Sequence, residues 1–140
     1  EMFLRVLHPT DFSTCANEAY AVVENLRAAG TQEVILLHVQ DERVMKHRTP
    51  EQLAAFDRED LERLQERCEH LSSLGYKARP ILRHGNPTKE TIQVADEARV
   101  GLIVMGSQGR SAIQELRTGS TLESVVRLAK QPVVMVRGKK

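Results

Sequence analysis

The apolar residues of this chain gather in short runs, which are separated by longer amphipathic stretches. Runs of this length predict strands that are buried on both faces, as in a parallel sheet. Four such runs stand at 3–8, 34–39, 102–105 and 133–136, and a less apolar fifth at 76–83 suits the edge of a sheet. The pattern therefore predicts five strands.

The stretches between the runs carry apolar residues at helical spacing. One predicted helix follows Ser13 and is ended by Gly30, and another, long and highly charged, spans 51–74. The long helix has a narrow apolar stripe of Leu61, Leu64, Cys68 and Leu71. A third helix follows a turn in which Asn86 suits the N-cap. A last helix begins near Ser120, and its apolar face consists of Leu122, Val125, Val126 and Ala129.

Strands that alternate with helices predict a parallel sheet covered on both faces. Right-handed crossovers and one reversal give the strand order 3-2-1-4-5. The predicted fold class is α/β, a doubly wound open parallel five-stranded sheet with helices on both faces, and residues 1–140 are expected to form a single domain. Ligands of such sheets bind beyond the carboxyl ends of the strands where the order reverses, here between strands one and four.

The segment 101–121 places a glycine-rich loop between a buried strand and the start of a helix. Gly106 and Gly109 follow the strand, and Gly119 and Ser120 end the loop. Glycine lets the main chain approach a ligand closely, and the first N–H groups of a helix are unpaired and partly positive. Phosphate is the usual ligand of such a site, although a tight turn without a ligand would use the same glycines.

Composition argues against several classes of function. The chain has 20 basic and 19 acidic residues and a formal net charge of +1, so no basic field indicates a nucleic acid or a membrane surface as partner. Aromatic residues make up 4% of the chain and Trp is absent, which disfavours a platform for stacked bases. A signal peptide, a lipidation motif and an apolar run of about 18 residues are all absent, so a cytoplasmic location is expected.

Three residues that could carry chemistry have a plainer interpretation. Cys15 and Cys68 stand far apart, in no metal-binding or redox spacing, and both fall on apolar faces of predicted helices. Packed thiols are therefore favoured over a disulfide. His38, inside the second apolar run, is predicted to be a packed core histidine rather than a ligand.

The glycine segment resembles a known motif. Its spacing, Gly106-x2-Gly109-x9-Gly119-Ser120, is similar to the G-x2-G-x9-G-[ST] motif of the ATP-binding universal stress proteins. Further segments resemble that family in the same order along the chain, namely 7–13, 34–39, 84–87 and 132–136. The similarity covers nearly the whole chain, which is identified as a member of this ATP-binding subgroup.

The resemblance implies an ATP-binding regulatory protein of the stress response. Backbone N–H groups would hold the phosphates, with added charge from Arg110. The residues that supply these N–H groups would be Gly106, Ser107, Gly109, Gly119, Ser120 and Thr121. Met105 and Val39 would lie near the base and ribose, and Pro9, Thr10 and Asp11 would close that end of the site. Asp11 is also a candidate helix cap, and both roles are compatible.

Hydrolysis of ATP is expected to be slow or partner-dependent at most. The glycine segment has no carboxylate pair and no Walker-type lysine, and its nearest acid is Glu115. Mg²⁺ or Mn²⁺ would be recruited by the phosphates themselves. A genuine slow ATPase and a nucleotide-independent scaffold are alternatives. A phosphoacceptor receiver domain is disfavoured, because Asp11 stands alone where that class has an acidic cluster.

The last strand, 133–136, is expected at an edge of the sheet, where it is apolar and has no charged guard. Antiparallel pairing with the same strand of a second copy would satisfy this edge under two-fold symmetry. The family resemblance implies the same homodimer. A monomer with a covered edge is the alternative, and an additional protein partner is compatible with either.

Overall fold

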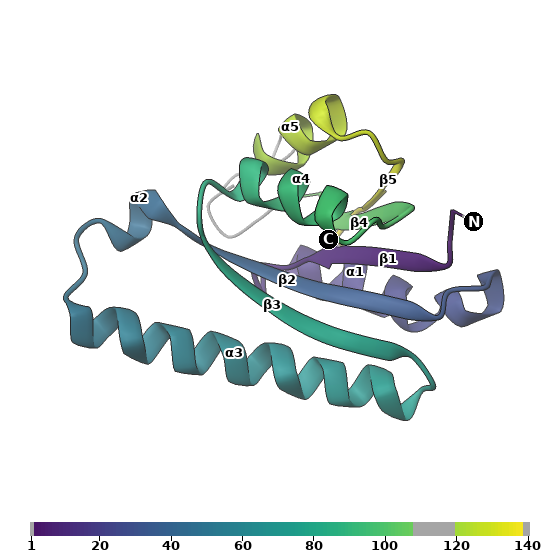
Figure 1. Ribbon diagram of the computed structural model, residues 1–140, viewed down its shortest axis with the longest axis horizontal. Helices are drawn as coiled ribbons and strands as arrows, with labels where there is room; N and C mark the ends of the chain where they lie inside the picture. Colours follow the sequence, from purple (N-terminus) through teal and green to yellow (C-terminus); the bar gives the residue numbers. More distant parts are fainter. Residues whose placement is uncertain (1, 108–119, 139–140) are drawn as a thin grey trace.

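The computed structural model describes residues 2–107 and 120–138. Five strands of this part of the chain form one parallel sheet in the order β3-β2-β1-β4-β5, which confirms the predicted order (Figure 1). They are β1 (Arg5–Pro9), β2 (Glu33–Asp41), β3 (Lys77–Gly85), β4 (Leu102–Gly106) and β5 (Val133–Val136). The order reverses between β1 and β4, which creates the crevice expected of a doubly wound sheet.

Helices cover both faces of the sheet. They are α1 (Thr14–Glu24), α2 (Glu42–Met45), α3 (Pro50–Ser73), α4 (Pro87–Glu97) and α5 (Ser120–Leu128), with a 3₁₀ turn at Leu26–Ala29. In Figure 1 the long α3 runs beside β3, while α4 and α5 lie together on the other side of the sheet. None of the described helices is both long enough and apolar enough to cross a lipid bilayer.

The core consists of two apolar layers, one on each face of the sheet. Along β2, Val34 and Leu36 belong to the layer shared with α1 and α3, whereas Ile35 and Leu37 belong to the layer shared with α4 and α5. All four side chains are fully buried. This alternation explains why the run reads as continuously apolar: both faces of a central parallel strand are covered.

The predicted first helix divides at its carboxyl end. α1 ends at Glu24, and a 3₁₀ turn leads to Gly30, whose φ of +102° is in the left-handed region. Gly30 therefore ends the 3₁₀ turn and not the α-helix itself, because its N–H donates to the carbonyl of Arg27 within that turn. Asn86 caps α4 as predicted, since its Oδ1 accepts from the N–H of Lys89 at 2.9 Å.

Two predicted apolar positions face solvent. The side chains of Leu61 and Val126 are 37% and 55% exposed. On α3 the buried positions are Asp60, Leu64, Cys68 and Leu71. These positions lie on one face of a helix. The buried face of α3 therefore begins at Asp60, whereas the apolar pattern predicts that it begins at Leu61.

Both thiols are free, and they differ in burial. Cys68 is buried in the layer between α3 and the sheet, and burial raises the pKa of its thiol to about 11. Cys15, in the first turn of α1, is only partly buried, so the prediction of two packed thiols is met fully by Cys68 alone.

Candidate functional site

A pocket of about 740 Å³ opens at the carboxyl ends of β1, β2 and β4. It lies at the point of the sheet where the strand order reverses, and α3, α4 and α5 contribute to its walls. The sequence predicts a ligand at this crevice from the topology alone. The volume is typical of a cleft that binds a small molecule.

Most of the residues predicted from the motifs line this pocket. They are Pro9, Thr10, Asp11, Val39, Met105, Gly106, Ser107 and Thr121. Gly109, Arg110 and Gly119 lie outside the described residues, as does Glu115. Ser120 is the first residue of α5, so the helix predicted after the glycine loop begins there.

The loop after β1 is shaped by hydrogen bonds from its own side chains. Ser13 Oγ accepts from the N–H of Ala16 at 3.2 Å and caps α1. Asp11 Oδ1 accepts from the N–H of Ser13 at 3.0 Å, and Thr10 Oγ1 accepts from the N–H of Phe12 at 3.0 Å. The helix cap is thus Ser13, and Asp11 stabilises the loop at the rim of the pocket.

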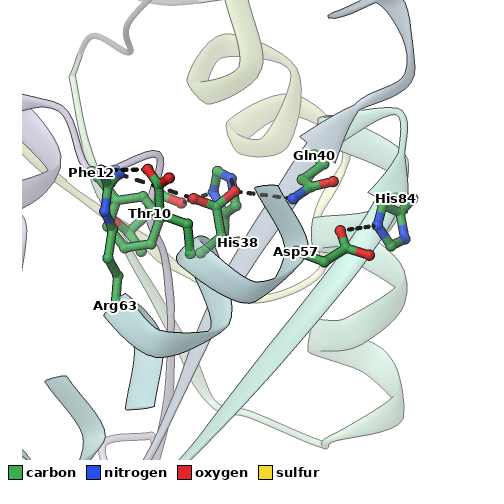
Figure 2. Close-up of polar contacts among 9 residues, drawn as sticks. Thr10, Phe12, His38, Gln40, Asp57, Arg63 and His84 are labelled. Carbon is green, nitrogen blue, oxygen red and sulfur yellow. Dashed lines mark hydrogen bonds and ion pairs between the residues drawn. The ribbon is translucent and has the colours of Figure 1, made fainter. Parts of the chain in front are cut away.

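Phe12 has an unusual backbone conformation within this loop. Its φ of +63° is left-handed, which is unfavourable for a residue with a Cβ. The ring contacts residues of β2 and α3. Its centroid lies 4.9 Å from that of the His38 ring (Figure 2). The guanidinium carbons of Arg63 and Arg67 lie 5.2 Å and 5.1 Å from the same centroid. These contacts fix the loop against α3 and so maintain the strained conformation.

A buried polar cluster forms the wall of the pocket beside β2. His38 Nδ1 lies 2.7 Å from the carbonyl oxygen of Thr10, and His38 Nε2 lies 3.2 Å from Asp60 Oδ2. Gln40 Nε2 donates to the same carboxylate oxygen at 3.0 Å. Figure 2 shows His38 and Gln40 on neighbouring positions of one face of the strand. The three side chains link the β1 loop, β2 and α3 into one network.

The motifs did not single out Asp60 and Gln40, although both line the pocket. A signal was present for Gln40: with His38 it places two polar side chains on the same face of an otherwise apolar strand, at its carboxyl end. Asp60 gives no such signal on its own, because a charged residue in a charged helix is usually solvated. The prediction that His38 is packed is confirmed by its exposure of 8%, and its position also puts it in the pocket wall.

The connection between β2 and α3 forms another wall of the pocket. It contains α2, capped by Asp41, whose Oδ1 accepts from the N–H of Arg43 at 2.9 Å. The hydrogen bond from the Arg43 side chain also lowers the pKa of Asp41. Farther along, the Arg48 guanidinium lies 4.9 Å from the ring centroid of Phe56 on α3. The sequence leaves two interpretations of the 41–50 connection open, a mobile flap at the site or a solvated loop. Because Arg43, Val44 and Met45 line the pocket, the structure favours a place at the site.

Gly106 and Ser107, at the carboxyl end of β4, are both constrained by neighbouring main chain. A Cβ on Gly106 would lie 2.6 Å from the backbone carbonyl of Cys15, so close packing of β4 against the start of α1 requires glycine there. The N–H of Ser107 donates to the carbonyl of Val136 at 2.8 Å. This corrects the expectation that the Ser107 N–H holds phosphate, because β5 already uses this donor. The Ser107 hydroxyl still lines the pocket.

Metal ligands do not cluster in the part of the chain that the structure describes. No group of three or more His, Cys, Asp or Glu side chains there could hold an ion. Acidic and basic groups both line the pocket: the acidic ones are Asp11, Asp41 and Asp60, and the basic ones are Arg43 on α2 and Arg48 in the segment after it.

Comparison with known proteins shows the family of this chain. Residues 2–137 match the family model described as the universal stress protein family. The chain belongs to that family. The universal stress protein MJ0577 of Methanocaldococcus jannaschii is 31% identical over an alignment of 157 positions. The alignment covers 99% of this chain and 97% of that protein. YxiE of Bacillus subtilis, another universal stress protein, is 30% identical, with 97% of this chain and 100% of that protein covered.

Solved structures of universal stress proteins share the fold. The structure of MJ0577 superposes with a TM-score of 0.93 at 32% identity and covers 100% of this chain and 99% of that one. UspA from Lactobacillus plantarum gives a TM-score of 0.85 at 22% identity, with 96% and 98% covered, and this likeness concerns the fold alone. The strand order and the helices on both faces are therefore features shared with these proteins.

Proposed function

We propose that this chain is an ATP-binding regulatory protein of the stress response, and that residues 1–140 act as a single domain. The pocket carries the proposal. It gathers the ends of β1, β2 and β4, which are remote in sequence, around a volume of about 740 Å³. Small-molecule sites usually have such a volume and combine apolar walls with a few polar groups.

The phosphates would lie at the β4 end of the pocket, where α5 begins. The N-terminus of a helix carries about half a positive charge and unpaired N–H groups, which attract phosphate. Thr121 lines the pocket at this end. Gly109, Gly119 and the charge of Arg110 would add to the phosphate site by the family motif, with the hydroxyl of Ser120.

The base and ribose would lie toward β2. Val39 on β2 and Met105 on β4 line the pocket and would pack near the base and ribose, and Pro9, Thr10 and Asp11 would close that end. Two other solved universal stress proteins are described as complexes, one with cAMP and one with dAMP. They are 20% and 17% identical to this chain, so the likeness concerns the fold, and the ligands are those of the proteins concerned. An adenine nucleotide is in keeping with them.

We infer that ATP is bound with slow or partner-dependent hydrolysis at most. Phosphoryl transfer to water requires ligands for a metal ion and a group that orients the nucleophile. The described pocket residues supply Asp11, Asp41 and Asp60, and all three carboxylates already accept hydrogen bonds from neighbouring groups. Mg²⁺ or Mn²⁺ would then be held through the phosphates of the nucleotide.

A thermal melt of nucleotide-stripped protein tests this proposal. ATP at about 100 times its Kd should add roughly 2.7 kcal/mol to the free energy of unfolding, which raises Tm by several degrees. The rise should be larger for ATP than for AMP or GTP, and Mg²⁺ should increase it. Gly109→Leu, whose melt without nucleotide checks its fold, should lose the rise. An unchanged Tm of the wild type at millimolar ATP contradicts the proposal.

The edge of β5 favours a second role, as a homodimeric scaffold. Val134 and Met135 on this edge strand are 36% and 41% exposed. Antiparallel pairing of 133–136 with a second copy would cover these side chains. Met135→Lys should shift the protein toward the monomer in sedimentation equilibrium, whereas Leu74→Lys, at a position of similar exposure beyond α3, should not. A wild type that sediments as a monomer excludes this dimer.

A further inference from the structure

We propose that Phe12 is a positioning residue of the nucleotide site, although it is not part of the pocket wall. Its ring holds the loop after β1 in a left-handed turn, and this turn keeps Thr10 and Asp11 at the pocket. The inference rests on the proposed function, because the effect of the ring is on the affinity for a nucleotide. It concerns the side of the loop that faces α3, which the glycine motif does not include.

Phe12 stands between the pocket residues of this loop and the start of α1. Thr10 and Asp11 are among the described residues that line the pocket, whereas Phe12 is not. Its ring packs instead against the apolar layer that α1 and α3 share with the sheet. Figure 2 shows Phe12 beside Thr10 and Arg63. An effect of this ring on a ligand must therefore pass through the main chain of the loop.

The backbone of Phe12 has a conformation that the ring contacts stabilise. Its φ is +63°, and a residue with a Cβ is disfavoured there by a factor of about ten. The guanidinium carbons of Arg63 and Arg67 lie 5.2 Å and 5.1 Å from the ring centroid, where a cation is attracted to the aromatic face. Arg67 Nη2 also donates to Asn17 Oδ1 at 2.8 Å, which ties this guanidinium to α1. These contacts offset the cost of the left-handed turn.

A change of φ at Phe12 would displace Asp11 more than the residues on either side of the turn. The start of α1 cannot follow, because Ala16 is buried and the first turn of the helix packs closely against the main chain of β4. Thr10 is also fixed, since its N–H donates to the carbonyl of Leu37 at 2.8 Å. Asp11 lies between these two fixed points, so its carboxylate would leave the pocket wall.

The affinity of the pocket then depends on how often the turn is left-handed. When only a fraction of the molecules is competent to bind, the apparent Kd rises by the reciprocal of that fraction. Without the ring, an alanine would hold a positive φ in about a tenth of the molecules. A glycine would do so in about half of them, because it populates both signs of φ about equally. The ring makes the competent fraction close to one.

The test compares Phe12→Ala with Phe12→Gly. Both variants lose the ring, and they differ in their freedom to adopt a positive φ. Titration calorimetry with ATP should show binding about tenfold weaker than that of the wild type for Phe12→Ala, and only about twofold weaker for Phe12→Gly. A ring that merely filled space would give equal affinities or weaker binding by the glycine variant, which has the larger gap and the more flexible loop.

Arg99 provides the matched control. It is the other residue with a Cβ at a positive φ among those that the structure describes, and its φ is +55°. It lies between α4 and the amino end of β4, whereas the pocket is at the carboxyl ends of the strands. Arg99→Gly should be more stable than Arg99→Ala in urea unfolding, and the two should bind ATP equally. An affinity difference at Arg99 like that at Phe12 would indicate a general effect of stability and overturn the inference.

Folded Phe12→Ala and Phe12→Gly proteins that bind ATP equally, or a glycine variant that binds more weakly, overturn the inference and leave the proposed function standing. If either variant does not fold, the double variant Arg63→Met and Arg67→Met decides. It keeps Phe12 and removes both cations from its ring, so ATP should bind about threefold more weakly. Unchanged affinity of this variant overturns the inference. A wild type that does not bind ATP overturns the proposed function and this inference together.

Discussion

Helix α3 makes two aspartate–histidine pairs with the sheet, one turn apart. Asp57 Oδ1 lies 2.8 Å from Nε2 of His84 on β3, and the two side chains are 41% and 46% exposed. Asp60 Oδ2 lies 3.2 Å from Nε2 of His38 on β2, and these side chains are 12% and 10% exposed. Figure 2 shows both contacts, with the His84 pair beyond the edge of the polar cluster.

The difference shows that the surroundings of such a pair matter more than its distance. The shorter pair lies in water, which screens the charges and competes for each hydrogen bond. The longer pair is shielded, and its carboxylate also accepts from Gln40, so its loss would leave several buried groups without partners. The same helix thus contributes a surface contact and part of a pocket wall.

A third histidine sharpens the comparison, because it is buried and its ring contacts a main-chain carbonyl. His8 on β1 is fully buried, and its Nδ1 lies 2.9 Å from the carbonyl of Val104. Burial lowers its pKa from 6.5 to about 4. Between these pH values the unfolded chain binds more protons than the folded one, so the free energy of unfolding must decrease as the pH falls.

The largest effect is therefore expected on acidification. His8 should contribute about 3 kcal/mol above pH 6.5, and most of this should be lost by a pH of about 4. Urea unfolding at a series of pH values measures the slope. His8→Leu has no imidazole to titrate, so its slope in this window should be shallower than that of the wild type. Equal slopes would show that His8 is not the group responsible.

A smaller loss is expected for the buried pair. Asp60→Ala removes the acceptor shared by His38 and Gln40 and should lower the free energy of unfolding by about 2 kcal/mol. Chemical denaturation at neutral pH measures it. If the cost were no greater than that of the exposed pair, burial would not distinguish the two.

The smallest effect is expected for the exposed pair. Asp57→Ala should change the free energy of unfolding by less than about 0.5 kcal/mol, and 1 M salt should reduce even this difference. The variant is the natural control for Asp60→Ala, since both lie on α3 and each contacts one histidine. A loss near 2 kcal/mol would reverse the comparison.

Much of the site could be predicted because it follows chain-local patterns. The strand order and the crevice came from the alternation of apolar runs, and Gly106 and Asp11 from motifs beside the strands. The structure adds a steric reason for Gly106, the backbone of Cys15 close to where a Cβ would stand. Ser107 was predicted to offer its N–H, which β5 occupies instead, because that pairing joins segments far apart in the chain.

Gln40 and Asp60 were missed for a related reason. Neither residue is unusual in its own segment: Gln40 is the penultimate residue of a strand, and Asp60 stands in a charged helix. The apolar pattern predicts that the buried stripe of α3 begins at Leu61, whereas the face turned to the sheet begins at Asp60. A buried aspartate is favourable there because Gln40 and His38 at the carboxyl end of β2 pack against α3 and contact its carboxylate.

The sequence by itself determined the class of this protein, since periodicity selects the elements and the glycine spacing selects the family and the crevice. Tertiary structure alone decided which polar groups meet there. The partners in the network of Thr10, His38, Gln40 and Asp60 come from three segments. Hydrogen bonds depend on tenths of an ångström between groups that only packing brings together, so no pattern along the chain records them.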